Sequence, residues 1–153
     1  MGGVVFRGRV LSRYLGPAQK VFPFVMTAGP ELEAAAAASG DLLAQYWLEE
    51  TANIALEEGV GWLAGRLAAR WGFPGLSSLD PGSLADWPIT EQPKLFSLFH
   101  GGEWLIGVRL TESCLMLPRK SVSGILFPSE ENFLSCRLCD RPGCSSRKAP
   151  FGG

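Results

Sequence analysis

The chain lacks a long apolar segment, an excess of basic residues and all but one histidine, His100. No stretch approaches the ~20 apolar residues of a transmembrane helix, and the first ten residues do not resemble a signal peptide. We therefore expect a cytoplasmic protein that does not enter a membrane. The 14 Lys and Arg are balanced by 15 Asp and Glu, for a net charge of −1. Nucleic acid is not an expected partner, because phosphate binding needs an uncompensated basic surface.

The scarcity of histidine also limits the possible reactions. With one His, a Ser/His/Asp or Cys/His nucleophile has little support. No glycine-rich loop precedes a helix, as a phosphate-binding loop would require. Whether the chain is itself an enzyme therefore stays open, and no catalytic residue is assigned.

What is present indicates one compact domain with an added tail. The 153 residues are 46% hydrophobic and 19% charged, which is typical of a single globular domain with a real core. Three of the four cysteines lie close together near the C-terminal end. We therefore divide the chain into an α+β domain, residues 1–135, and a cysteine-rich tail, residues 136–153.

The first half of the chain predicts two strands and two helices. Residues 4–11 and 21–28 are short, apolar and rich in β-branched and aromatic residues, which favours strands. Residues 30–38 predict a helix. A longer helix is expected from a cap at Asp41 to about Trp71, because apolar residues recur every three or four positions. Three glycines interrupt this helix and are expected to let another backbone or a large side chain lie close: Gly59, Gly61 and Gly65.

The second half predicts a loop, a helix and two strands. Residues 72–88 hold three prolines and three glycines, which predicts an ordered surface loop. A short helix is expected over 90–100, and strands over 104–117 and 121–127 with a turn at 118–120. The order β-β-α-α-α-β-β predicts an α+β fold, with an antiparallel sheet and helices packed to one side.

Two segments carry a resemblance to a known family. Residues 110–127 contain LTES, then a proline, then SVSG and a phenylalanine. Upstream, residues 81–96 contain Pro-Gly, then DWP, Glu-Gln and Leu-Phe. In this order and spacing they resemble the C-terminal activation domain of cobalamin-dependent methionine synthase. The resemblance covers roughly residues 20 to 135, and the cysteine-rich end looks like that of a short, free-standing relative.

The resemblance implies a fold and a function. The family fold is a C-shaped α+β domain around a twisted antiparallel sheet. The family domain binds S-adenosylmethionine and docks over a cobalamin domain. There it supports reductive activation and methylation of cob(II)alamin, and a flavodoxin-type donor supplies the electron. The expected partner is therefore a corrinoid (cobalamin-binding) protein or methyltransferase.

The chain departs from the family pattern beside the Pro-Gly pair. The family has an Arg shortly before it and a Tyr just after it, where this chain has Ser78 and Ser83. An Arg holds the carboxylate of the methionine moiety by a forked, charge-assisted contact, which Ser cannot supply. We therefore expect the S-adenosylmethionine site to be lost or modified.

The candidate cofactor contacts lie on the second resembling segment and in the loop. Glu112 is expected on a strand face with Leu110 and Cys114, half-buried among apolar groups. There it would contact a ligand amine or the corrinoid domain, or pair with a neighbouring arginine. Ser121 and Ser123 are expected on one face, lining a ligand cleft or satisfying a turn.

A glycine and four loop residues complete this set. Gly124 would let a ligand or a backbone approach closely. The loop residues are Pro81, Gly82, Asp86 and Trp87. Of these, Trp87 is the expected contact residue among the five tryptophans, and capping of the following helix is an alternative role for Asp86.

Cys136, Cys139 and Cys144 follow a Cys-x2-Cys-x4-Cys pattern. A two-residue gap lets two thiolates bind one ion, as in zinc knuckles and iron–sulfur sites. Three ligands leave a tetrahedral site one short. Cys114 is the natural fourth, with His100 or a water or substrate thiol as alternatives. The pattern predicts a soft-metal site for zinc or an iron–sulfur cluster, with free thiols or a disulfide as alternatives.

The sequence therefore predicts an accessory protein that docks on a corrinoid protein and supports reductive activation of its cobalamin. The alternative is a metal protein whose cysteine cluster carries electrons or a methyl group in a corrinoid methyltransferase system. A third possibility is a structural subunit of a methyltransferase complex.

Overall fold

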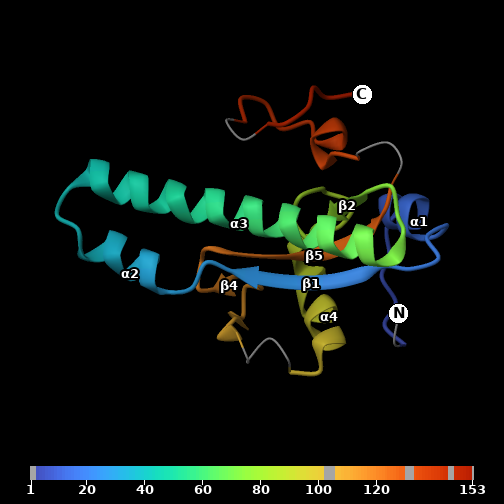
Figure 1. Cartoon of the computed structure of the whole chain (residues 1–153), viewed down its shortest axis with the longest axis horizontal. Helices are drawn as coiled ribbons and strands as arrows, with labels where there is room; N and C mark the ends of the chain where they lie inside the picture. Colours follow the sequence, from blue (N-terminus) through green and yellow to red (C-terminus); the bar gives the residue numbers. More distant parts are fainter. Residues whose placement is uncertain (1–2, 102–105, 130–132, 145–146, 153) are drawn as a thin grey trace.

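A long helix and a three-stranded antiparallel sheet form the centre of the fold (Figure 1). The computed structural model describes residues 3–101, 106–129, 133–144 and 147–152. In chain order the larger elements are α1 (Arg9–Leu15), β1 (Phe22–Thr27), α2 (Glu31–Ala38), α3 (Leu42–Trp71), β2 (Leu76–Leu79), α4 (Gln92–Phe96), β3 (Arg109–Leu110), β4 (Met116–Leu117) and β5 (Ser121–Pro128). Short 3-10 helices flank α4 at Ile89–Glu91 and Ser97–Phe99, and another spans Ser135–Leu138. The α+β class is confirmed.

The sheet has the order β1-β5-β2, and both pairs are antiparallel. Phe24 of β1 lies opposite Gly124 of β5, and Ser78 of β2 lies opposite Leu126. β5 is the central strand, and residues 123–127 within it are all buried. A central strand covered on both faces reads as a nearly continuous apolar run, which is why this segment was recognisable as a strand.

Each face of β5 packs against different elements, because side chains alternate along a strand. α3 lies on one side of the sheet, and α2 packs against α3 beyond the ends of the strands (Figure 1). On the other face, Ile125 and Phe127 belong to the main core, together with residues from α1, β2, α4 and the following segments: Leu11, Leu79, Leu84, Trp87, Leu95 and Phe133. The core therefore lies on the face of the sheet away from α3.

The two helices of the first half are confirmed. The side chain of Asp41 accepts a hydrogen bond from Leu43 N at 3.0 Å, which caps α3 as expected. The helix ends at Gly72, whose left-handed φ of 69° is a common helix stop. No helix in the described part of the chain combines the length and apolar character needed to cross a membrane.

The expectation for the glycines in α3 is correct at one position of three. A β-carbon on Gly59 would collide with the sulfur of Met26 on β1, so this glycine lets the helix approach the sheet. Gly61 and Gly65 face open space. A side chain at either position would therefore meet no neighbouring residue.

The strand predicted over residues 4–11 is wrong, because α1 begins within it at Arg9. The backbone N–H of Val10 donates to the carboxylate of Asp86 at 2.7 Å, which satisfies one of the free donors of the helix start. Leu11 is buried, and Val10, Tyr14 and Leu15 pack against the same core. This spacing is helical, but the segment is too short to display the period in the sequence.

The loop predicted over 72–88 contains strand β2, which occupies the second edge of β5. Only this pairing decides its conformation, since Leu76–Leu79 is short and half polar. The helix predicted over 90–100 is divided into α4 and two 3-10 turns, and it ends at His100 with a left-handed φ of 52°.

The strand predicted over 104–117 is also wrong as a continuous element. Residues 102–105 lie outside the described part of the chain. The rest forms a two-stranded hairpin of β3 and β4. Its turn is closed by Thr111, whose N–H donates to Leu115 O and whose carbonyl accepts from Cys114 N. Cys114 has a φ of 63°, which breaks the extended backbone.

Candidate functional site

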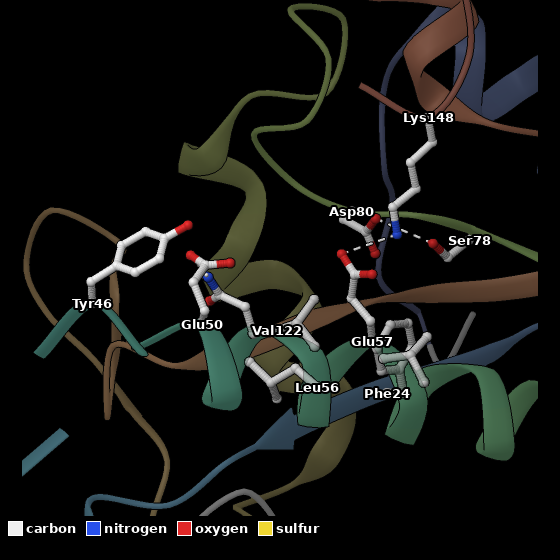
Figure 2. Close-up of a pocket in the computed structure, with 11 residues that line it drawn as sticks. Phe24, Tyr46, Glu50, Leu56, Glu57, Ser78, Asp80, Val122 and Lys148 are labelled. Carbon is white, nitrogen blue, oxygen red and sulfur yellow. Dashed lines mark hydrogen bonds and ion pairs between the residues drawn. The ribbon is translucent and has the colours of Figure 1, made fainter. Parts of the chain in front are cut away.

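A cavity of about 720 Å³ lies between α3 and the sheet (Figure 2). Its lining comes from α3, all three strands of the sheet and the C-terminal tail: Phe24, Tyr46, Glu50, Asn53, Leu56, Glu57, Val60, Ser78, Asp80, Val122 and Lys148. The apolar side chains of the sheet and of α3 form its floor. The polar groups gather at its two ends, with Tyr46 and Glu50 at one end and Asp80, Ser78, Glu57 and Lys148 at the other.

Asp80 directly follows β2 and is fixed by a tight turn. Ser83 N donates to Asp80 O at 3.1 Å, and Gly82 has a φ of 85°. These features, with Pro81 at the second position, are those of a type II turn. One carboxylate oxygen of Asp80 accepts a hydrogen bond from Ser78 Oγ at 3.2 Å. The other, Oδ1, is buried and has no hydrogen-bond partner within the described part of the chain.

Gly124 makes room for this carboxylate. A β-carbon at position 124 would collide with Oδ1 of Asp80 and with the carbonyl oxygen of Leu79. The absence of a side chain therefore lets an acidic group lie against the central strand. Burial raises the pKa of Asp80 to about 6, and the hydrogen bond from Ser78 opposes this rise only in part.

Lys148 reaches the cavity from the tail, which passes over α3 (Figure 1). Its ammonium lies 3.1 Å from the carboxylate of Glu57, and its backbone N–H donates to Cys136 Sγ at 3.4 Å. The neighbouring Arg147 donates to the carbonyl oxygens of Cys136 and Cys139 at 3.1 and 3.2 Å. These contacts fold the cysteine segment back on itself and position Lys148 at the cavity.

Glu50 at the other end accepts a hydrogen bond from Asn53 Nδ2 at 3.1 Å. Asn53 Oδ1 in turn accepts from Lys120 Nζ at 3.0 Å. Lys120 also lies 3.6 Å from Glu49. The ammonium group of Lys120 is therefore held by Asn53 and Glu49. Glu50 lines the cavity, and its described hydrogen-bond partner is the amide of Asn53.

The loop residues predicted from the sequence support the fold around this cavity. Asp86 receives the N–H of Val10 and so caps α1, rather than the helix that follows it in the sequence. Trp87 was expected to contact a ligand or partner at the surface, and that expectation is wrong. Its side chain is fully buried and makes an edge-to-face contact with Phe6. The Pro81-Gly82 pair shapes the turn that places Asp80.

Of the β5 candidates, Gly124 lies against Asp80, which lines the cavity, and the two serines do not line it. Ser121 and Ser123 share one face, as expected, but it is the face away from α3. The hydroxyl of Ser121 donates to Pro118 O at 2.6 Å and lies 2.9 Å from Thr27 Oγ1, so it stabilises the β4–β5 turn. Ser123 is buried, and its hydroxyl has no partner among the described residues.

Glu112 does not lie on a half-buried strand face, and that expectation is wrong. It is exposed in the turn of the β3–β4 hairpin. The turn forms because Thr111 Oγ1 lies 3.0 Å from Ser113 Oγ and accepts from Leu115 N at 3.1 Å. These local side-chain bonds compete with an extended strand.

The predicted metal ligands are not assembled here. Cys114, Cys136, Cys139 and Cys144 are all half-buried free thiols. Within the described ranges, no three His, Cys, Asp or Glu residues are grouped as a metal site would require. The metal site therefore stays a prediction from the spacing alone.

Sequence reasoning missed the acidic residues of the cavity. A signal for two of them exists, since Glu50 and Glu57 are seven residues apart and so share a helix face. Asp80, immediately before Pro-Gly, could have been noted from its place in the loop. Lys148 had no such signal, because its position depends on the folding of the tail over α3.

The cavity does not fit the amino-acid end of S-adenosylmethionine. A ligand carboxylate needs a cationic partner. Ser78 is uncharged, and Lys148 is already paired with Glu57. The remaining charged groups that line the described cavity are carboxylates, which would repel that end of the ligand.

The sequence is similar to that of a known family over part of its length. No curated protein matches the sequence. Residues 81–137 match the family described as vitamin B12 dependent methionine synthase, activation domain. The matched segment includes the Pro-Gly turn, α4, the β3–β4 hairpin and β5, and it contributes most residues of the main core. Over residues 81–137 the chain is thus similar to the activation domain of vitamin B12 dependent methionine synthase.

Proposed function

We propose that this chain is an accessory protein that docks on a corrinoid protein or methyltransferase and supports the reductive activation of its cobalamin. The observation that carries the proposal is the match of residues 81–137 to the activation domain of a vitamin B12 dependent enzyme. An external donor of the flavodoxin type is the proposed source of the electron. The role of the chain is to bind the partner and hold its cobalamin domain in a reducible state.

The β3–β4 hairpin is the proposed docking element. It lies within the matched segment, and its turn exposes Glu112 and Leu115, the latter with 57% of its surface accessible. A large apolar side chain beside an acidic one on an exposed turn suits a protein contact with an apolar centre and a polar rim. Neither side chain supports the core, so both are available to a partner.

The docking test uses the purified full-length chain and a cob(II)alamin-loaded corrinoid protein. Gel filtration and the visible spectrum of the corrinoid report binding. We expect co-elution and a changed cob(II)alamin spectrum, and faster reduction when a flavodoxin-type donor is added. If no corrinoid protein co-elutes or changes its spectrum, the proposal is wrong.

A pair of variants locates the docking surface. Leu115→Asp places a charge on the hairpin and should abolish co-elution. Ile54→Asp is the matched control, because Ile54 is similarly exposed at 60% but lies on α3, outside the matched segment. If only Ile54→Asp loses binding, the docking surface lies on α3, and the role of the hairpin is contradicted.

S-adenosylmethionine is not expected to bind in this cavity, because the cavity does not fit its carboxylate. Calorimetric titration at millimolar concentration should give no binding heat. Binding would show that the ligand contacts groups outside this cavity, and it would restore methylation to the proposed role.

The alternative function rests on the cysteine spacing and on one contact, the N–H of Lys148 that donates to Cys136 Sγ. Such N–H donors stabilise thiolates, the form that binds metals. Metal analysis of anaerobically purified protein tests this alternative. One zinc per chain would support a zinc site, and brown colour with iron would support a cluster. Metal-free protein that activates its partner fully would exclude both.

A further inference from the structure

The charges around the α3–sheet cavity do not balance. Among the described lining residues, three are acidic and one is basic. The basic residue, Lys148, is engaged with Glu57 at 3.1 Å. Asp80, at the same end, accepts a hydrogen bond from Ser78 at one oxygen and has no ion pair among the described residues, while its other oxygen is buried against Gly124. This end therefore holds two carboxylates and one ammonium group, and a buried carboxylate that no cation pairs with is costly, so this end of the cavity favours a positively charged ligand group.

The opposite end has the same imbalance. Lys120 is held by Asn53 and Glu49, while Glu50 receives only an amide N–H among the described residues. Each end of the cavity therefore has one carboxylate more than the cations it contains. These two carboxylates are Glu50 and Asp80.

The region between the ends is apolar. Leu56 and Val122 lie between the two polar groups in Figure 2, and Phe24 lies beside the group that contains Asp80. Glu50 and Glu57 are seven residues apart on α3, which is roughly 10 Å along a helix that rises 1.5 Å per residue. Because Glu57 lies at the same end as Asp80, this rise indicates the length of the cavity between its two polar ends. The cavity is thus an apolar trough with a carboxylate at each end, and its length suits a short alkyl chain.

We infer that this cavity binds a linear aliphatic diamine, with one ammonium group at Glu50, the other at Asp80 and the methylene chain along the apolar floor. An ammonium group has three donors and no acceptor, which suits carboxylate and hydroxyl partners. Charge-assisted bonds of this kind are about twice as strong as neutral ones. The same carboxylates reject a ligand that carries a negative charge. This site concerns the cavity alone and does not depend on docking to a corrinoid protein.

Cadaverine and free lysine are matched probes, because lysine is cadaverine with a carboxylate added at one end. Calorimetry on the full-length chain, at a pH well above the pKa of Asp80, should show one cadaverine site. Free lysine should bind at least about tenfold more weakly, since a tenfold change corresponds to one lost favourable contact. Pentylamine, with one ammonium group, should fall between the two. Equal affinity for cadaverine and lysine, or no cadaverine binding, overturns the inference.

Variants connect binding to the two carboxylates. Asp80→Asn and Glu50→Gln keep the shape of the side chain and remove its charge, and each should weaken cadaverine binding by about fivefold or more. Glu58→Gln is the matched control, because Glu58 is exposed on the same helix and does not line the cavity. A similar loss from Glu58→Gln would show non-specific attraction to an acidic surface and would overturn the site. Thermal unfolding checks the fold of each variant, and Glu50→Gln decides the result if Asp80→Asn does not fold.

Discussion

The carboxylate of Asp80 lies against the backbone of Gly124, in the space that a β-carbon would occupy. This contact joins the Pro-Gly turn to the central strand, two parts of the matched segment that are about forty residues apart in the sequence. It also explains why the cavity has an acidic end, because the carboxylate can lie there only while position 124 has no side chain.

Gly124→Ala should therefore destabilise the protein. The added methyl group would displace Asp80 or the carbonyl of Leu79, and overpacking of this kind costs about 1–3 kcal/mol. Urea unfolding measures the loss. Gly65→Ala is the control, because a β-carbon on Gly65, in the middle of α3, would meet no other atom. There Ala should stabilise the protein by about 1 kcal/mol through its higher helix propensity. Equal stability of the Gly124 variant and the natural chain would contradict the close contact.

Asp80 should make stability depend on pH. Its pKa is raised from 3.8 to about 6 by burial, so between these values the folded protein holds a proton that the unfolded chain has released. Stability from this group is therefore present below about pH 4 and is lost as the pH rises through 6. The groups that face it are Glu57 on α3, Lys148 in the tail and Ser78 on β2.

Asp80→Asn isolates this effect. The variant should be more stable than the natural chain at neutral pH, by on the order of 3 kcal/mol. The difference should shrink as the pH falls toward 4. Thermal melting across this range measures it, and an advantage that is constant with pH would show that titration of Asp80 is not the cause.

Asp86 should stabilise α1 across a long sequence distance. Its carboxylate accepts the N–H of Val10 at 2.7 Å, and the loss of such a helix-start contact costs about 1 kcal/mol. Asp86→Ala should lower the free energy of unfolding by this amount. Asp86→Asn keeps an acceptor oxygen and should lose less. If both substitutions leave stability unchanged, the hydrogen bond does not hold α1 in solution.

Arg147 should control access to the tail. Its guanidinium donates to the carbonyl oxygens of Cys136 and Cys139. Arg147→Gln should therefore release the segment and increase its cleavage by trypsin at the remaining basic residues. Arg141→Gln is the control, because the exposed Arg141 takes part in this set of contacts only through its backbone. Similar cleavage rates for both variants would contradict the organising role of Arg147.

The predicted elements that proved correct are those specified locally. α3 has a capping Asp41, a helical apolar period and a glycine stop at Gly72, so its limits could be read without tertiary contacts. β1 and β5 are apolar runs bounded by turn residues. α1 and β2 are short, and contacts with distant residues determine their conformation. Asp86 caps α1, and β2 pairs with the open edge of β5.

The candidate site divides in the same way. The sequence by itself determined the α+β class, the family resemblance and the cysteine spacing, because each is written in the order of residues along the chain. Only the tertiary structure decided that Glu112 lies in an exposed turn, that Trp87 is core and that Ser121 and Ser123 face away from α3. It also decided which acids meet across the cavity, because Glu50, Asp80 and Lys148 come from separate segments whose proximity depends on packing between α3 and the sheet.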